Sequence, residues 1–482
     1  MKHIKYLVFA ITGLILTSCS DEFLNPLPDT SVAVDAFFQS DEDVLAGVIG
    51  IYDALQGVNE NTVTNIGNAN RGVQFEHLLT EHRTDNTRNA TLEGSKSDFH
   101  RYVVNANNVE SEDYYASMYE VIFRANNILN FMDVADADNQ PKYTAEAKFL
   151  RAYAYFKLVR LYSDVPLVTE VVGPTDEEAL FTRIPEAEIY AQIVDDLQEA
   201  VDVLDNTYKS RASKAAAQAL LAKVYLTQPN PNYTEAQQLC EAIINSMEFD
   251  LEPNFYDVFY SELNDEIIFA IQYESGNAQE SQSFSSEFTS AIRAGREDGQ
   301  NIVNDNLIVD FVAFGGARTA ISYTTVDGSN EVAKFFPDGF DSTAQPEPYG
   351  PNARNAGNDY IAIRFADVLL MHVEAAIGSG TSTSDVAALT SFQRIRDRAF
   401  PETAPNSISS VSKQELLVER RVELAFENQR WFDLLRFGVA DEVLTAHAAE
   451  MGYIYNSRAL LLPIPAREIN ISKGLLTQNP GY

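Results

Sequence analysis

Two histidines five positions apart are the first candidates for chemistry in this 482-residue chain. His77 and His82 lie within the stretch EHLLTEH, and each follows a glutamate. A zinc-binding helix needs histidines four positions apart, because these then share one face. A separation of five places them roughly 140° apart around a helix. The spacing therefore argues against a zinc site and favours polar histidines in a loop.

Other motifs of enzymes and cofactor sites are missing from the sequence. It contains no Gly-x-Ser-x-Gly nucleophile elbow, no Walker A loop and no dinucleotide fingerprint. Cys240 has no basic neighbour to lower the pKa of its thiol, so we expect a small core residue. The many carboxylates leave a glycosidase pair open, because the separation of two carboxyl groups is a property of the fold. We expect a protein that is not an enzyme and has no catalytic residues, metal or cofactor. The sequence neither supports nor excludes a structural calcium ion.

Cys19 is the residue with the clearest chemical role. Residues 1–18 carry two lysines, then an apolar stretch from Tyr6 to Leu16, then two small residues. The apolar stretch is too short for a helix that spans a bilayer, which takes roughly 20 residues. The order of charge, apolar run, small residues and cysteine is similar to the lipobox of bacterial lipoproteins. It predicts a signal peptide over residues 1–18 and acylation of Cys19, which anchors the protein in a membrane.

Acidic residues follow the cysteine directly. Asp21 and Glu22 are similar to the surface-export signal of Bacteroidota lipoproteins and favour the outer face of the outer membrane. Residues 19–34 are expected to tether the anchor to one domain that spans residues 35–482. The formal net charge of −35 argues against nucleic-acid binding, which needs clustered Lys and Arg. It also argues against adhesion to an anionic membrane through protein charge.

The elements that must position any binding site are mostly helical. Apolar residues recur at helical spacing, for example at Phe149, Ala152, Tyr153 and Phe156. Such patterns predict helices over residues 35–55, 146–161, 188–204, 212–226, 234–247, 362–377, 385–398 and 413–437. No strict period of about 34 residues is visible. The pairing of helices across short breaks nevertheless predicts a mainly α fold of tetratricopeptide-like helix pairs.

Two regions interrupt the helical pattern. Residues 59–108 are rich in Asn, Thr and Gly, and residues 251–359 in Gly, Pro, Ser and aromatics. The second region contains short apolar runs such as Ile267–Ile271. We predict loop-rich insertions with a few short strands. Loops on a rigid scaffold often carry binding residues, although solvated connections without a ligand are the alternative.

Four stretches have a specific pattern together. They are EAKFLRAYAYF at residues 146–156, IRFADVLLM at 363–371, ERRVELAFE with RWFDLLRFG across 419–438, and LPIPARE with NPGY in 462–482. Their charged residues are spaced for ion pairs within and between packed helices. Trp431 is the single tryptophan, and within a helical motif it is expected to be a core anchor and not a sugar platform.

In this order the four stretches resemble the SusD/RagB family, and the resemblance covers essentially the whole mature chain. It implies a surface lipoprotein with four tetratricopeptide-like helix pairs and a less regular second half. It also implies binding of oligo- or polysaccharides, no covalent chemistry, and a position as a lid on a SusC-like TonB-dependent transporter. The glycan cleft of this family comes from variable loops, where aromatic rings and polar side chains contact sugars.

The candidate ligand-binding residues are chosen by residue type within the two irregular regions. The first region contributes Arg71, His82, Arg83, Asp85, Asn86, Arg88 and Phe99. The second contributes Tyr273, Phe284, Phe288 and Arg293. Neither region contains Trp, so stacking on a sugar falls to Tyr, Phe or His.

A cluster of basic side chains stands out in this acidic chain. It consists of Arg71, His77, His82, Arg83, Arg88 and Arg101. One hypothesis is recognition of an acidic glycan such as a uronate polymer. The favoured interpretation is that the arginines pair with nearby acidic residues, namely Glu76, Glu81, Asp85 and Glu93.

Three alternatives to glycan capture stay open. The same type of complex could capture peptides or glycopeptides. A surface glycan hydrolase is less favoured. A purely structural lid on the transporter, which binds nothing by itself, is the third.

Overall fold

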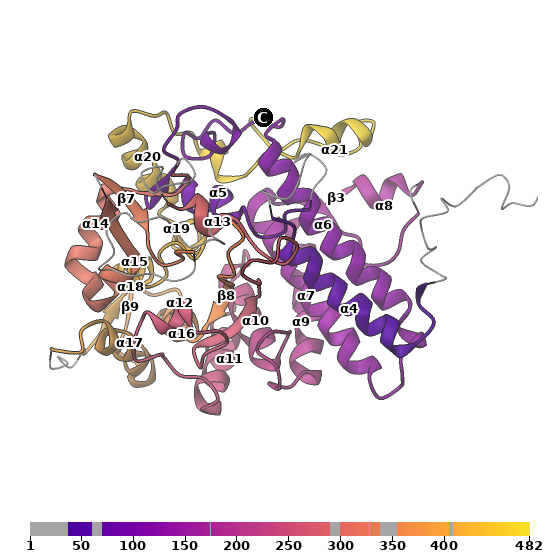
Figure 1. Cartoon of the computed structure of the whole chain (residues 1–482), viewed down its shortest axis with the longest axis horizontal. Coiled ribbons are helices and arrows are strands. Elements are labelled where there is room, and N and C mark those ends of the chain that lie inside the picture. The colour runs from indigo at the N-terminus through magenta and orange to yellow at the C-terminus, as the bar shows by residue number, and fades with distance from the viewer. Residues whose placement is uncertain are drawn as a thin grey trace, which may run out of the picture.

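The computed structural model describes residues 37–59, 70–173, 175–289, 299–326, 328–337, 354–403 and 408–482. The predicted signal peptide, the tether, Cys19 and Arg293 lie outside these residues. Long helices coloured indigo to magenta fill one side of the molecule, and short helices and strands fill the other (Figure 1). None of the described helices is long and apolar enough to cross a bilayer.

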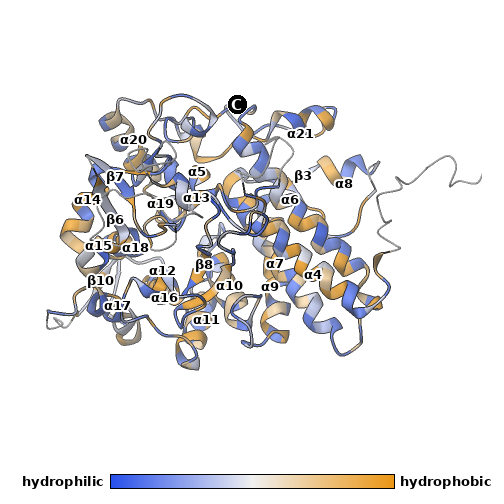
Figure 2. Ribbon diagram, viewed as in Figure 1, coloured by the Kyte–Doolittle hydropathy of each residue, from blue (hydrophilic) through white to orange (hydrophobic). Residues whose placement is uncertain are grey.

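The long helices form one continuous array in which each packs against the next. In order of contact they are α4 (Asp41–Gln56), α6 (Val109–Asn130), α7 (Gln140–Tyr162), α9 (Glu186–Val203), α10 (Lys214–Thr227), α11 (Tyr233–Ser246), α16 (Phe365–Ile377) and α17 (Val386–Ala399). Orange and blue alternate around several of these helices, as expected for amphipathic helices with one buried face (Figure 2). The predicted mainly α fold of helix pairs is confirmed.

Local sequence sets several helix boundaries. The hydroxyl of Ser40 accepts a hydrogen bond from Asp43 N and caps α4, and Ser213 caps α10 in the same way. Ser412 and Glu415 form a capping box at α18 (Lys413–Glu423). Small residues in α10 let its neighbours approach closely, since Ala216, Ala219 and Ala222 are fully buried there.

Two helix predictions need correction, and one helix was not predicted. Residues 362–364 belong to strand β8 (Tyr360–Arg364), where paired backbone groups replace the predicted helix. The predicted helix over 413–437 is two helices, α18 and α19 (Arg430–Arg436). Between them Phe426 and Asn428 have φ of 69° and 61°, which a right-handed helix does not allow. The pattern also missed α6, a long helix with a low mean hydropathy.

The irregular half contains short antiparallel pairs. One sheet has the order β1 (Thr87–Arg88), β5 (Ile302–Val303), β7 (Ser329–Val332) and β6 (Tyr323–Val326). The predicted apolar run forms β4 (Ile267–Ile271), which pairs with β8. The remaining pairs are β2 (Val165–Pro166) with β3 (Arg183–Ile184), and β9 (Ser382–Thr383) with β10 (Val411–Ser412).

Further helices lie before, between and after these strands. They are α5 (Glu76–Leu79), α8 (Glu177–Phe181), α12 (Asp257–Tyr260), α13 (Phe284–Glu287), α14 (Asp305–Asp310), α15 (Thr319–Ser322), α20 (Ala440–Met451) and α21 (Ala466–Ile471). The chain end returns to the helical array, because Leu462 N donates to Leu161 O at 2.8 Å and Asn479 Nδ2 donates to Tyr162 O at 2.9 Å.

Candidate functional site

An open pocket of about 800 Å³ lies in the irregular half, next to the helical array. It is bordered by α12 and the turn after it, by the segments after β4 and before β8, and by the end of α4. Its volume falls within the range of about 300–1,000 Å³ typical of small-molecule sites. We call it the tyrosine pocket; its polar and aromatic lining includes Gln56, Tyr256, Tyr260, Glu262, Gln272 and Asp359.

Two tyrosines on one side of α12 give this pocket its aromatic wall. The rings of Tyr256 and Tyr260, one helical turn apart, stack with centroids 4.4 Å apart and planes 24° apart. The Tyr260 hydroxyl donates to Ala333 O at 2.6 Å and accepts from Phe336 N at 3.0 Å, so this ring is fixed. A fixed ring at a pocket wall offers an apolar face to the apolar face of a sugar.

The opposite wall depends on a close approach of two chain segments. A Cβ atom on Gly357 would lie 2.6 Å from Ser275 N, so only glycine fits there without a shift of the backbone. Gln56 joins the walls by donating from Nε2 to Gln272 O at 2.8 Å. Leu263, in the turn after α12, has φ of 44°, a strained conformation of the kind that concentrates at ligand sites.

The charge of the tyrosine pocket is entirely negative among the described residues that line it. They include Glu262, Glu274, Glu280 and Asp359, and no Lys, Arg or His. Burial raises the pKa of Asp359 to about 7, although Tyr273 N donates to its Oδ1 at 3.1 Å. Such a wall accepts hydrogen bonds from hydroxyl groups and repels carboxylate or sulfate groups.

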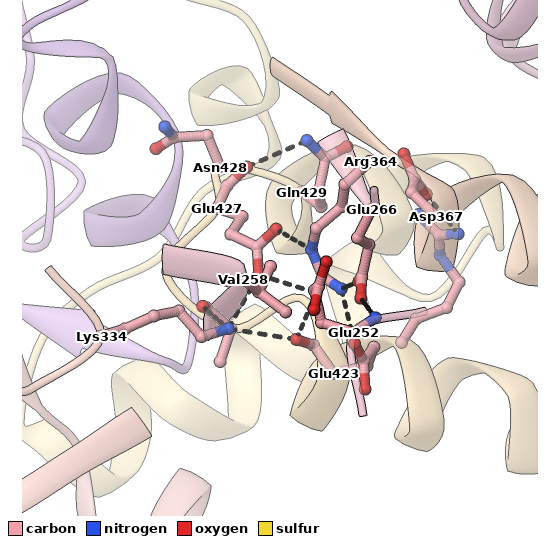
Figure 3. A network of polar contacts seen from close by, with 12 residues as sticks. Glu252, Val258, Glu266, Lys334, Arg364, Asp367, Glu423, Glu427, Asn428 and Gln429 are labelled. Carbon is pink, nitrogen blue, oxygen red and sulfur yellow. Dashed lines mark hydrogen bonds and ion pairs between the residues drawn. The ribbon is translucent and has the colours of Figure 1, made fainter. Parts of the chain in front are cut away.

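A buried ion network lies next to the pocket and joins β8 to the C-terminal motif (Figure 3). Arg364 contacts Glu266 at 2.6 Å and Glu423 and Glu427 at 2.7 Å each, and all four side chains are at least 95% buried. Lys334 Nζ donates to Glu427 Oε1 at 2.8 Å. These contacts hold β4 and β8, whose ends form the pocket wall, against the segment that follows α18.

Burial and the opposite charges in the network shift the pKa of Glu423 in opposite directions. Burial alone would raise the pKa of Glu423, but Arg398, Arg364 and Arg318 hold it well below its usual range. Burial lowers the pKa of Lys334 to about 8. The ion pairs expected from the C-terminal motif are thus present, although several partners, such as Arg318, come from distant sequence.

Most candidate residues of the first irregular region are buried in structural contacts. Arg71 pairs with Glu110 and Asp113, and its guanidinium lies 4.0 Å from the Phe75 ring centre. Arg83 lies 3.7 Å over the ring of Trp431. Trp431 is fully buried, which confirms the core anchor.

The polar candidates of that region also have partners within the protein. Asp85 pairs with Arg421 and Arg430 at 2.9 Å each. Asn86 donates from Nδ2 to Glu81 Oε2 at 3.1 Å and accepts from Arg421 Nε at 2.9 Å. Their position in the interior comes from ion pairing across more than 300 residues of sequence, which local composition does not reveal.

Aromatic and histidine candidates are buried as well. Phe99, Phe284 and Phe288 are 0%, 6% and 3% exposed. His82 is fully buried beside His77, with ring centroids 5.4 Å apart, and burial lowers its pKa well below the usual range. The expected polar loop histidines are therefore interior residues. Among the described residues, no three His, Cys, Asp or Glu side chains converge as metal ligands.

Two candidates do line an open pocket. Tyr273 lies in the wall of the tyrosine pocket, and its hydroxyl donates to Gln56 O at 2.8 Å. Arg88 lines a second cavity of about 450 Å³, bordered by β5, the start of α14, Gly328 with the start of β7, and α20. We call this cavity the Arg88 pocket. These two residues come from different irregular regions and serve different pockets.

The basic cluster does not pair as its sequence neighbourhood suggested. Glu76 pairs with Lys157 at 2.6 Å, from the helical array, and not with an arginine of the cluster. Arg88 and Arg101 donate to the backbone oxygens of Asn89 and Leu92. The favoured local pairing is wrong: Glu76 and Asp85 pair with distant basic residues, and Glu81 accepts hydrogen bonds from Asn86 and from Asn428 N.

Sequence reasoning missed Tyr256 and Tyr260. Both lie in the aromatic-rich region that was expected to hold the site. Their spacing of four residues, from the N-cap to the last residue of α12, was the available signal, because i and i+4 side chains meet on one helix face. Cys240, by contrast, is fully buried as expected, and burial raises the pKa of its thiol.

Comparison with known proteins matches most of the chain. Residues 317–482 match the model of the SusD family, and residues 22–226 match a family described as starch-binding associating with outer membrane. SusD-like protein P2 of Formosa agariphila is 29% identical over the whole of both chains. A SusD-like protein of Bacteroides ovatus is 27% identical and covers 89% of this chain and 82% of its own length.

Solved structures share the fold over nearly the whole chain. A laminarin-binding SusD-like protein superposes with a TM-score of 0.74 at 24% identity, over 92% of this chain and all of its own. Surface glycan-binding protein A from Bacteroides thetaiotaomicron, solved with laminarihexaose, gives a TM-score of 0.75 at 20% identity, over 91% of this chain and 99% of its own.

Proposed function

The chain belongs to the SusD family, and from this premise we propose that it captures a neutral oligo- or polysaccharide in the tyrosine pocket. The observation that carries the proposal is the ring of Tyr256 stacked on the fixed ring of Tyr260, beside carboxylates and amides in a cavity of about 800 Å³. Two of the solved relatives, a laminarin-binding SusD-like protein and a surface glycan-binding protein in complex with laminarihexaose, support a glycan as the ligand class.

The proposal also covers the location of the protein, its membrane anchor and the transporter that receives the glycan. The family that matches residues 22–226 is described as associating with the outer membrane. Acyl chains on Cys19 would hold the protein there, facing the exterior, and a SusC-like TonB-dependent transporter would receive the glycan. Membrane fractionation of a Cys19→Ala variant tests the anchor, and a membrane-bound variant would contradict it.

The protein acts by binding and not by catalysis in this proposal. Because several carboxylates line the tyrosine pocket, the experiment measures whether the bound glycan is cleaved. Incubation with the bound glycan should release no shorter products. Product release would favour the glycan hydrolase.

A binding titration of Tyr256→Ala with neutral glucan oligosaccharides tests the site. Loss of one stacking face should weaken binding about tenfold, because the contact area and the ring's orientation are both lost. Tyr208→Ala is the matched control, since Tyr208 is 50% exposed and does not line the pocket. Equal effects of the two substitutions would remove the tyrosine pocket from the proposal. Wild-type protein that binds peptides and no glycan would favour peptide capture.

A further inference from the structure

The Arg88 pocket has a lining unlike that of the tyrosine pocket. Its volume of about 450 Å³ is within the range of small-molecule sites. Among the described residues, Arg88 is the one Lys or Arg that lines it, together with neutral amides and with Asp305 and Glu450. Figure 1 shows α14, β7 and α20, which border it, at one end of the irregular half.

Arg88 lacks a carboxylate partner within the described part of the chain. Its Nη1 donates to Asn89 O at 3.2 Å, and no described Asp or Glu lies within ion-pair distance. Of the other arginines of the same region, Arg71 pairs with carboxylates and Arg83 stacks on an aromatic ring. Arg101 donates to Leu92 O and does not line the pocket. A guanidinium group has five N–H donors, so Arg88 retains donors for a ligand.

Two buried polar side chains of the pocket lack hydrogen-bond partners. Asn304 is 6% exposed and its Nδ2 has no acceptor, and His447 is 5% exposed and its Nδ1 has no partner. Both residues line the pocket. A buried polar atom without a partner costs free energy, which a ligand oxygen can recover. These atoms therefore point to a polar ligand independently of Arg88.

We propose that the Arg88 pocket is a second saccharide site that takes a single sugar unit carrying one carboxylate, such as a uronate at a branch or chain end. The planar guanidinium of Arg88 matches a carboxylate, and Asn304 and His447 supply polar groups for the remaining oxygens. Asp305 and Glu450 accept hydrogen bonds from the hydroxyls of the same unit and repel a second negative charge. The pocket thus selects an isolated uronate over a polyuronate.

The proposal rests on glycan capture as the function but not on the tyrosine pocket as its site. The test is a binding titration of the complete chain, solubilised in detergent. The probe is xylotriose with one glucuronate branch, compared with the same compound after reduction of its carboxyl group. The measured quantity is the ratio of the two affinities, which isolates the charge from every contact that the compounds share.

The wild-type chain should bind the acidic compound about tenfold more tightly than the reduced one. In Arg88→Gln the ratio should fall to one or below, because Asp305 and Glu450 then repel the carboxylate without compensation. Arg88→Lys, which keeps the charge but not the fork, should retain part of the preference. Arg101→Gln is the matched control, because Arg101 also donates to a backbone oxygen, that of Leu92, but lines neither pocket.

Several outcomes would overturn the second site. They are a ratio near one in the wild type, no binding of the acidic compound, or the same ratio in Arg88→Gln as in Arg101→Gln. A galacturonate trimer that binds more tightly than the branched compound would overturn the selection of one charge. Tyr256→Ala, measured in parallel, should leave the ratio unchanged. If it also leaves the affinity for neutral glucan unchanged, the tyrosine pocket fails while the Arg88 pocket stands.

Discussion

The two pockets lie in the same irregular half and differ in how their charge is arranged. The tyrosine pocket combines a stacked aromatic pair with carboxylates and, among its described lining residues, has no cation. In the part of its lining that the structure describes, the Arg88 pocket has one arginine, two buried polar atoms without partners, and no aromatic ring apart from His447. The difference shows that one scaffold can place an aromatic stacking surface and an arginine-lined cavity in separate parts of its irregular half.

The two pockets are also supported by different elements of the fold. The wall of the tyrosine pocket is continuous with β4 and β8, which the buried ion network holds through Arg364. The Arg88 pocket is built on the sheet of β1, β5, β7 and β6 and on α20. Damage to the network should therefore affect the tyrosine pocket first.

The largest expected effect comes from Arg364→Ala. The substitution leaves Glu266, Glu423 and Glu427 without one of their cations in a buried site, which should lower the free energy of unfolding by about 3–5 kcal/mol. Chemical denaturation measures this change. Binding of neutral glucan should weaken more than binding of the branched uronate compound.

Arg394→Ala is the control for that experiment. Arg394 pairs with Asp250 at 2.6 Å, but the two side chains are 33% and 73% exposed. An exposed pair contributes about 0–1 kcal/mol. Equal losses in the two variants would show that the network does not support the fold in the way described.

A smaller effect, of opposite sign in the two pockets, is expected from pH. Asp359 has a pKa raised to about 7, so between about pH 4 and pH 7 the folded state holds more protons than the unfolded state. Its contribution to stability is therefore lost as pH rises through this window, by at most about 1.4 kcal/mol per pH unit. Asp359→Asn should remove that slope, so its melting temperature should gain on the wild type from pH 4 to pH 7.

His447 should behave in the opposite way in the Arg88 pocket. Burial lowers its pKa, so below about pH 6.5 the unfolded state takes up the proton first and stability is lost as pH falls. His447→Gln should therefore gain on the wild type on acidification. Thermal melts of both variants across pH 4–8 measure the two trends. Parallel trends would contradict the contrast between the pockets.

The helices that could be predicted from the sequence are those in which apolar residues recur at regular local spacing. Helices such as α9, α10 and α11 lie within a few residues of their predicted bounds, because side chains three and four positions apart share a buried face. Trp431 and Cys240 were expected in the core and are fully buried. The helix α6 was missed, since its many acidic and amide residues obscure the apolar stripe.

The site could be predicted only as a region. Residue type selected Arg71, Arg83 and Asp85, but their burial depends on partners such as Glu110, Trp431 and Arg421 that lie far along the chain. Composition cannot separate an arginine in a buried pair from one at a cavity wall. Arg88 differs from its neighbours only in what the fold places beside it.

The smallest expected effect is a difference in salt dependence. The screening length falls from about 10 Å at 0.1 M salt to about 3 Å at 1 M. The interaction between the ligand and the charged side chains close to it therefore weakens over this range. Arg88 attracts the uronate, whereas Asp305 and Glu450 repel it, and the net slope of the wild type therefore mixes both signs. The comparison with Arg88→Gln removes only the attraction.

Between these salt concentrations the wild type should lose about twofold more affinity for the uronate compound than Arg88→Gln does. Neutral glucan in the tyrosine pocket provides the reference, because its affinity should stay constant in both proteins. Parallel slopes for the uronate compound would mean that Arg88 does not contact the carboxylate.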